Sequence, residues 1–274
     1  MGTRNFREML EVKWAEGKFA CAGLDSSDGD RMCAVVDATH DLVCAYKPNT
    51  AFYEAWGAQG WETLLRVTKH IRAVAPTVPV ILDGKRTDIG STNLGYVQMA
   101  FEYLGADAIT VNPYFGQEAL EPFLCQKEKG IIVLCRTSNK GAGEFQDLAV
   151  HPSEWTQALY TKFGGRMVMP LYQYIANQVS AQWNKNGNCA LVVGATYPGE
   201  LAQVRHIVGD MPILIPGIGT QGGDLKEAVL AGKDSRGWGI IINYSRGIIR
   251  APDPRKATEE INILTNQYLK GGVA

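Results

Sequence analysis

The most informative stretch of the sequence reads VILDGKRTDI over residues 80–89, where an apolar run leads directly into four charged side chains within six positions. The apolar residues predict a strand over Val78–Leu82, and charged groups directly after a strand are typical of the end at which α/β proteins build their sites. Since residues i and i+2 of a strand face the same side, Asp83 and Lys85 should point together toward that end. Asp88 lies beyond the predicted strand, where it could turn back to the site or reach a partner subunit.

Similar apolar runs recur along the whole chain and alternate with longer amphipathic segments. The eight predicted strands are Phe19–Leu24, Leu42–Tyr46, Val78–Leu82, Ala108–Val111, Ile131–Cys135, Ala190–Val193, Ile213–Ile215 and Gly239–Asn243. Predicted helices include Trp61–Ala73, Thr92–Leu104, Pro198–Val208 and Asp224–Ala231, and Ser153–Trp183 is long enough for one helix or two. Regular alternation indicates an α/β fold, and eight βα units favour a closed (β/α)8 TIM barrel over an open doubly wound sheet. With 274 residues, the chain should form a single domain over residues 1–274.

Composition argues against several classes of function. Lys plus Arg is 27 and Asp plus Glu is 28, giving a formal net charge of −1 without runs of like charge, so neither nucleic acid nor a membrane is an expected partner. Charged residues from Arg4 to Glu16 rule out a signal peptide in the first 20 positions. The six cysteines lack metal-ligand spacing and read as reduced thiols, so we expect no zinc site, no disulfide framework and a cytoplasmic location.

Ionisable residues end three successive predicted strands. Asp25 follows the first strand, Lys47 the second, and Asp83 with Lys85 the third. An isolated Asp-x-Lys is usually a salt-bridged strand end facing solvent, but three such ends in succession are uncommon for surface placement. An array of alternating charges keeps each one compensated when it is partly desolvated, and it would hold an ammonium group where an anion needs stabilising.

The spacing Asp83-x-Lys85-x-x-Asp88-Ile89-Gly90-x-Thr92 resembles the signature of the orotidine 5′-monophosphate decarboxylases. Residues in the family's order also follow the other strands: Asp25, Lys47, Thr137-Ser138, the segment PGIGTQGGD over 216–224, and Ser245-Arg246-Gly247. The resemblance covers nearly the whole chain and is closer to the longer bacterial branch. Two positions depart from the family's pattern, because Lys140 stands where proline is frequent and Ser245 where glycine is frequent.

The resemblance implies a decarboxylase that needs neither a cofactor nor a metal. Lys85 would stabilise the carbanion left at carbon 6 of the pyrimidine and then protonate it to give UMP, which combines electrostatic and general-acid catalysis. Asp83 would lie near the departing carboxylate. Lys47 would contact Asp83 and a ribose hydroxyl, and Asp25 would accept a hydrogen bond from the ribose.

The resemblance also implies how the rest of the substrate is bound. The glycines over 217–223 would let backbone N–H groups approach the phosphate, and Gln221 and Arg246 would bind it through their side chains. Pro216 and Ser245 would contact the substrate beside them. Ser138 would hydrogen-bond the pyrimidine edge. In the family, the counterparts of Asp88 and Thr92 come from the neighbouring subunit, so a homodimer with shared active sites is expected.

Two other functions remain open from the sequence. One is a sugar-phosphate keto-acid decarboxylase of the same superfamily, which holds Mg²⁺ partly through an acidic residue after strand two, the position that Lys47 occupies in this chain. The other is a catalytically silent barrel that only binds a nucleotide. Turnover and its sensitivity to a chelator distinguish the three.

Overall fold

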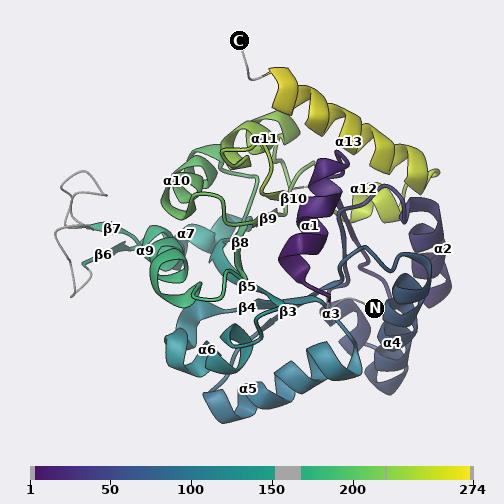
Figure 1. Ribbon diagram of the computed structural model, residues 1–274, viewed down its shortest axis with the longest axis horizontal. Coiled ribbons are helices and arrows are strands. Elements are labelled where there is room, and N and C mark those ends of the chain that lie inside the picture. Colours follow the sequence, from purple (N-terminus) through teal and green to yellow (C-terminus); the bar gives the residue numbers. More distant parts are fainter. Residues whose placement is uncertain (1–3, 152–167, 220, 272–274) are drawn as a thin grey trace.

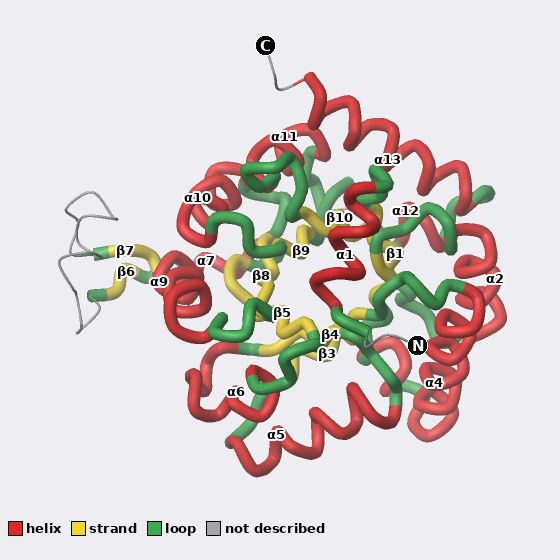
Figure 2. The backbone as a smooth tube through the Cα atoms, viewed as in Figure 1, coloured by secondary structure: helices red, strands yellow, loops and turns green. Residues whose placement is uncertain are grey.

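Eight parallel strands form a nearly closed barrel in the computed structural model, which describes residues 4–151, 168–219 and 221–271. They follow the order β2-β1-β10-β9-β8-β5-β4-β3, and the bridges Tyr46↔Val80 and Asn49↔Asp83 join its two ends. The strands are β1 (Ala20–Gly23), β2 (Ala45–Lys47), β3 (Ile81–Arg86), β4 (Ala108–Val111), β5 (Gly130–Arg136), β8 (Cys189–Val193), β9 (Ile213–Ile215) and β10 (Ile240–Tyr244). Figure 2 shows this ring of strands inside a ring of helices, so the predicted (β/α)8 barrel is confirmed.

Most helices cover the outside of the barrel between successive strands, whereas α1 precedes the first strand and α12 and α13 follow the last one (Figure 1). They are α1 (Phe6–Ala15), α2 (Gly29–Thr39), α3 (Ala51–Glu54), α4 (Gly57–Val74), α5 (Gly90–Val97), α6 (Gly116–Leu124), α7 (Gly143–Gln146), α9 (Leu171–Gln178), α10 (Pro198–Val208), α11 (Leu225–Gly232), α12 (Arg246–Ile249) and α13 (Pro254–Gly271). Shorter turns are the 3-10 segments η2 (Pro113–Phe115) and η3 (Lys140–Ala142) and the π-helical segments η1 (Gln98–Tyr103) and η4 (Val179–Trp183). None of the helices in the described ranges is long and apolar enough to cross a membrane.

Several boundaries differ from the sequence prediction. The third strand runs on to Arg86, so Asp83, Lys85 and Arg86 lie inside it, and Asp88 lies beyond its end as expected. The predicted helix Thr92–Leu104 is α5 followed by π-helical η1. Of the predicted helical segment Ser153–Trp183, α9 and η4 occupy the later part, and residues 153–167 lie outside the described residues. The antiparallel pair β6 (Ala149–Val150) and β7 (Met169–Pro170) was not predicted.

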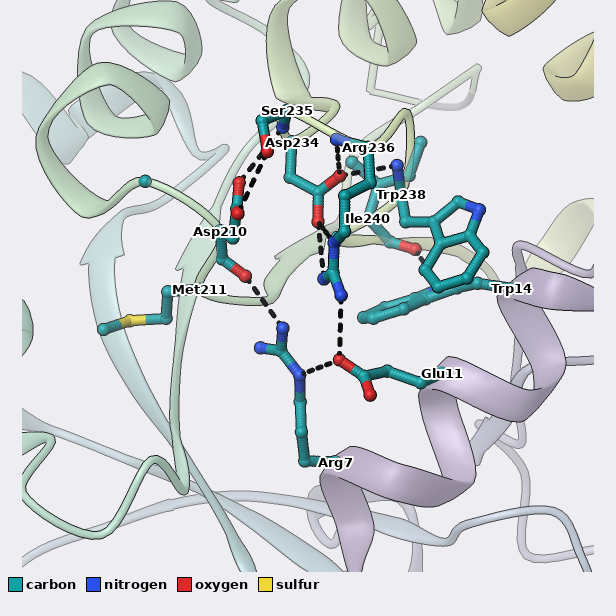
Figure 3. A network of polar contacts seen from close by, with 12 residues as sticks. Arg7, Glu11, Trp14, Asp210, Met211, Asp234, Ser235, Arg236, Trp238 and Ile240 are labelled. Carbon is teal, nitrogen blue, oxygen red and sulfur yellow. Dashed lines mark hydrogen bonds and ion pairs between the residues drawn. The ribbon is translucent and has the colours of Figure 1, made fainter.

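Helix α1, also not predicted, lies across the end of the barrel at which the strands begin. Its residues bond at or before the beginning of strands: the Trp14 indole N–H donates to the carbonyl of Ile240, the first residue of β10, at 2.8 Å, and Arg7 donates to the Asp210 carbonyl at 3.1 Å. Figure 3 shows the ion pairs that extend this contact, in which Glu11 accepts from Arg7 and Arg236. The helix therefore closes the end of the barrel opposite to the strand ends that carry the predicted site.

Replacing Trp14 with phenylalanine should destabilise the protein without changing its activity. The ring is 1% exposed, and its loss removes a buried hydrogen bond at an expected cost of about 1–3 kcal/mol. Thermal unfolding should show a melting temperature several degrees lower, while turnover stays within about twofold of the wild type. Trp238→Phe is the matched control, because Trp238 is half-buried in the same network and stacks against Arg236. An equal loss in both variants would contradict the importance of the Trp14 hydrogen bond.

Candidate active site

A cavity of about 870 Å³ opens at the end of the barrel where the strands finish. Its walls come from the end of β3 and from the segments after β1, β2, β5, β9 and β10. Its floor includes apolar side chains of the strands, among them Leu134, Val192 and Leu214. Nine of the eleven predicted site residues line it: Asp25, Lys47, Asp83, Lys85, Ser138, Pro216, Gln221, Ser245 and Arg246. The fold thus brings together side chains that are up to 221 positions apart, from Asp25 to Arg246.

Asp83 is the centre of the charged array. Its Oδ2 accepts a hydrogen bond from Lys47 Nζ at 2.7 Å, and its Oδ1 accepts one from Lys85 Nζ at 2.7 Å. Lys47 and Asp83 are buried, whereas 47% of the Lys85 side chain is exposed to the cavity side. The prediction that Asp83 and Lys85 lie side by side is therefore confirmed, and Lys85 is the ammonium group that a bound molecule can reach.

Electrostatics keep this array ionised. Burial alone would raise the pKa of Asp83, but the positive charges of Lys47 and Lys85, together with their hydrogen bonds, hold that pKa well below its ordinary value. Burial would lower the pKa of Lys47, yet the carboxylates of Asp83 and Asp25 raise it above its ordinary value. Both members of the buried pair are charged at neutral pH, and their charges compensate each other.

Asp25 offers an unused acceptor to the cavity. Its Oδ1 is buried and has no hydrogen-bond partner among the residues that the structure describes. A buried carboxylate oxygen without a donor is costly, so a hydroxyl group placed beside it would be bound favourably. The position suits the predicted contact with a sugar hydroxyl.

Gln221 and Arg246 line the cavity from the segments that follow β9 and β10. Three glycine amides of the loop are already bonded within it: Gly219 N–H donates to the Gly223 carbonyl, Gly222 N–H to Gly219, and Gly223 N–H to Gly217. These amides hold the turn rather than face a ligand, so an anion here would depend on the two side chains more than the glycine pattern predicts. Ser245 fits beside β1 because Gly23 has no side chain; a Cβ there would lie 2.8 Å from that of Ser245.

Ser138 packs between two other glycines at the cavity wall. A Cβ at Gly194 would lie 2.7 Å from Ser138 Cα, and one at Gly217 would lie 2.9 Å from its Cβ. Gln146 fixes the start of the same loop, since its Oε1 accepts from the Thr137 N–H at 2.8 Å and its Nε2 donates to Thr137 Oγ1 at 2.9 Å. The loop that includes Lys140 is therefore held at its first residues by a side chain that the sequence analysis missed.

Further polar residues at the site were not predicted, and three of them come from β2, β4 and β10 or directly after them. Asn49 Nδ2 donates to Asp83 at 3.3 Å, Thr110 Oγ1 donates to Asp83 at 2.9 Å, and Asn243 lines the cavity floor. A signal existed for two of them, because Thr110 and Asn243 are the polar members of otherwise apolar strand runs. Asn49 follows Lys47 by two positions, the spacing that places side chains on one side of a strand.

Asp88 and Thr92 do not line the cavity of their own chain. Thr92 is exposed near the start of α5, and Asp88 Oδ1 accepts from the neighbouring Ile89 N–H at 2.6 Å. Exposed apolar side chains occur in the segments after β2, β3 and β4, the same face of the barrel: Phe52, Trp56, Ile89, Leu94, Tyr114 and Phe115. Within a single chain these two predicted site residues therefore remain apart from the other nine.

Comparison with known proteins identifies a family model, orotidine 5′-phosphate decarboxylase / HUMPS family, that matches residues 19–261. Curated orotidine 5′-phosphate decarboxylases of Janthinobacterium sp. (strain Marseille) and Aromatoleum aromaticum are 48% and 47% identical to this chain. The first alignment covers 79% of this chain and 73% of the relative, and the second covers 90% of each.

Solved structures give the same result. The OMP decarboxylase of Leishmania donovani is 37% identical, with a TM-score of 0.84 over 97% of this chain and 99% of that one. The UMP synthase of the same organism is 38% identical with a TM-score of 0.87, and this chain corresponds to 57% of that longer protein.

Proposed function

The chain belongs to the orotidine 5′-phosphate decarboxylase / HUMPS family, and on this premise we propose that Lys85 is the proton donor of its reaction. That reaction is the decarboxylation of orotidine 5′-monophosphate to UMP, the last step of pyrimidine nucleotide synthesis. The observation that carries the proposal is the position of the Lys85 ammonium group, which is held 2.7 Å from a carboxylate yet accessible from the cavity.

In the proposed step, the bond between carbon 6 and the carboxylate breaks, CO₂ leaves, and the electron pair remains on carbon 6. The Lys85 ammonium stabilises this pair as it develops and transfers one proton to it, after which the neutral amine regains a proton from solvent. Asp83 holds Lys85 in place and lies near the departing group. Lys47 neutralises Asp83 from the buried side and would reach a ribose hydroxyl.

The rest of the nucleotide would lie across the cavity. Asp25 would accept a hydrogen bond from the ribose through its free Oδ1, Ser138 would bond the pyrimidine edge, and Gln221 with Arg246 would bind the phosphate. Pro216 and Ser245 would contact the nucleotide between these groups. The loops after the last two strands are the usual place of a phosphate site in such a barrel, and an arginine is a strong hydrogen-bond donor to phosphate.

We further propose that the chain acts as a homodimer whose single domain over residues 1–274 shares its site with a second copy. Support comes from Asp88 and Thr92, which lie outside their own cavity on a face with exposed apolar side chains. A partner of the same sequence placed on that face would bring its Asp88 and Thr92 to the open side of the cavity. We place the enzyme in the cytoplasm, where its six free cysteines would remain reduced.

The rival function, Mg²⁺-dependent decarboxylation of a sugar-phosphate keto acid, needs carboxylate oxygens free to bind the ion. Asp83 instead has both oxygens engaged by ammonium groups. Loss of orotidine 5′-monophosphate absorbance should proceed at the same rate with and without EDTA, within about twofold. A silent nucleotide-binding barrel would show no turnover with or without EDTA, and the magnesium-dependent rival would lose its activity when EDTA is added.

A further inference from the structure

The third and fourth strands of the barrel pair irregularly at the site. Leu82 pairs with Ile109 and Arg86 pairs with Val111, so four steps along β3 correspond to two along β4. Residues 83–85 therefore lie opposite the single residue Thr110, which is two residues more than in a regular ladder and forms an irregular arch in β3. Lys85 has φ of +48°, the one positive value at a non-glycine position among the described residues. A lysine is rarely found in this left-handed region, so neighbouring groups must hold it there.

The side chain opposite this arch is Thr110, which is 1% exposed in an otherwise apolar strand. Its hydroxyl makes two hydrogen bonds: the Lys85 backbone N–H donates to Thr110 Oγ1 at 2.9 Å, and Thr110 Oγ1 lies 2.9 Å from Asp83 Oδ1. Since the ionised carboxylate can only accept, the single hydroxyl hydrogen must be donated to Asp83. The directions of both bonds are thereby fixed.

The same oxygen of Asp83 also accepts from Lys85 Nζ at 2.7 Å. Thr110, the Asp83 carboxylate and the two nitrogen atoms of Lys85 therefore form a closed ring of three hydrogen bonds. In the regular part of the ladder a backbone carbonyl of β4 would receive such an N–H, and here the hydroxyl replaces it. A valine of the same shape would keep the packing but leave the Lys85 N–H and one acceptor site of Asp83 without this partner.

We propose that Thr110 is a positioning residue for the decarboxylation, which fixes the backbone of Lys85 and the carboxylate of Asp83 through one hydroxyl group. It acts through these two residues and need not touch the substrate. The inference rests on the proposed role of Lys85 as the acid. Because a small displacement of the ammonium group from carbon 6 weakens proton transfer, Thr110 should contribute to the chemical step more than to binding.

Thr110→Val tests the proposal by steady-state kinetics with orotidine 5′-monophosphate and by calorimetric titration with UMP. We expect kcat to fall about ten- to hundredfold, while KM and the dissociation constant of UMP change less than about threefold. Thr110→Ser restores the hydroxyl and should recover kcat to within about threefold of the wild type. Thr110→Ala, which removes the hydroxyl without adding a second methyl group, should lose kcat as the valine variant does.

Thr68→Val is the matched control, because Thr68 is equally buried but its hydroxyl bonds only to the Leu65 carbonyl of its own helix. It should keep the wild-type kcat with a similar change in melting temperature. Unchanged kcat in Thr110→Val, failure of serine to rescue, or parallel losses of kcat and UMP affinity would overturn the proposal. A wild type without turnover, or a fully active Lys85→Ala, would instead overturn the function on which it rests.

Discussion

Lys85→Ala is expected to lower kcat by about 10⁴-fold or more, the largest effect of any single substitution at the site. A positioned general acid contributes roughly 10²–10⁴ to a rate, and a fixed charge beside a developing anion adds a comparable factor. The substitution also leaves Asp83 with Lys47 as its one ammonium partner, so its Oδ1 faces the cavity without the positive charge that would offset repulsion of the substrate carboxylate. Steady-state assays that follow the loss of substrate absorbance measure the change.

Lys140→Ala is the control for charge alone. Lys140 lines the same cavity from η3, so its removal takes away one positive charge without altering the array around Asp83. Its kcat should remain within about tenfold of the wild type. Comparable losses in Lys85→Ala and Lys140→Ala would mean that the cavity uses its lysines only as general positive charge, which would contradict a specific acid.

Mixing two inactive variants should restore activity if the sites are shared. In a heterodimer of Lys85→Ala and Asp88→Ala, one site combines an intact Lys85 with an intact Asp88 from the other subunit. The second site lacks both. Random exchange of subunits makes half of the dimers mixed, so about a quarter of the wild-type activity should return. Asp88→Ala alone should lose about a hundredfold, the effect of removing a charged hydrogen-bond acceptor.

The matched control mixes Lys85→Ala with Asp83→Ala. Both residues line the cavity of their own chain, so every site in the mixture remains defective and no activity should return. Native mass spectrometry of the same mixtures verifies that subunits have exchanged. Exchange without recovery in the first mixture, or recovery in the control mixture, would contradict the shared site.

The barrel and the charged centre could be predicted because short stretches of the sequence encode both. Buried parallel strands need continuous apolar runs, so their number and order can be read along the sequence. Charged residues that directly follow such runs lie at the carboxyl ends of the strands, where these barrels carry their sites. The extent of the third strand was not visible. Its continuation to Arg86 depends on an irregular pairing with β4, which is a property of two strands rather than of one stretch of sequence.

Other features depend on contacts that no local pattern encodes. Thr110 is visible in the sequence only as a polar residue in an apolar strand, and its contact with Asp83 depends on how two strands pair. Glycines over 217–223 predicted free amides, but three of them bond within the loop. Helix α1, by contrast, could have been predicted from the sequence, because Phe6, Leu10 and Trp14 recur at the four-residue spacing of a buried helix face. Asp88 and Thr92 cannot be placed in a site by one chain alone.

A single-turnover experiment tests the role of Lys85 most directly, because it isolates the chemical step from product release. Enzyme in excess over orotidine 5′-monophosphate is mixed rapidly in the presence of EDTA, and the absorbance decay is followed for the wild type and for Lys85→Ala, with UMP affinity measured for both. We predict a fast decay for the wild type and a decay about 10⁴-fold slower for the variant, with UMP still bound by each. A variant whose decay rate lies within tenfold of the wild type would contradict Lys85 as the proton donor.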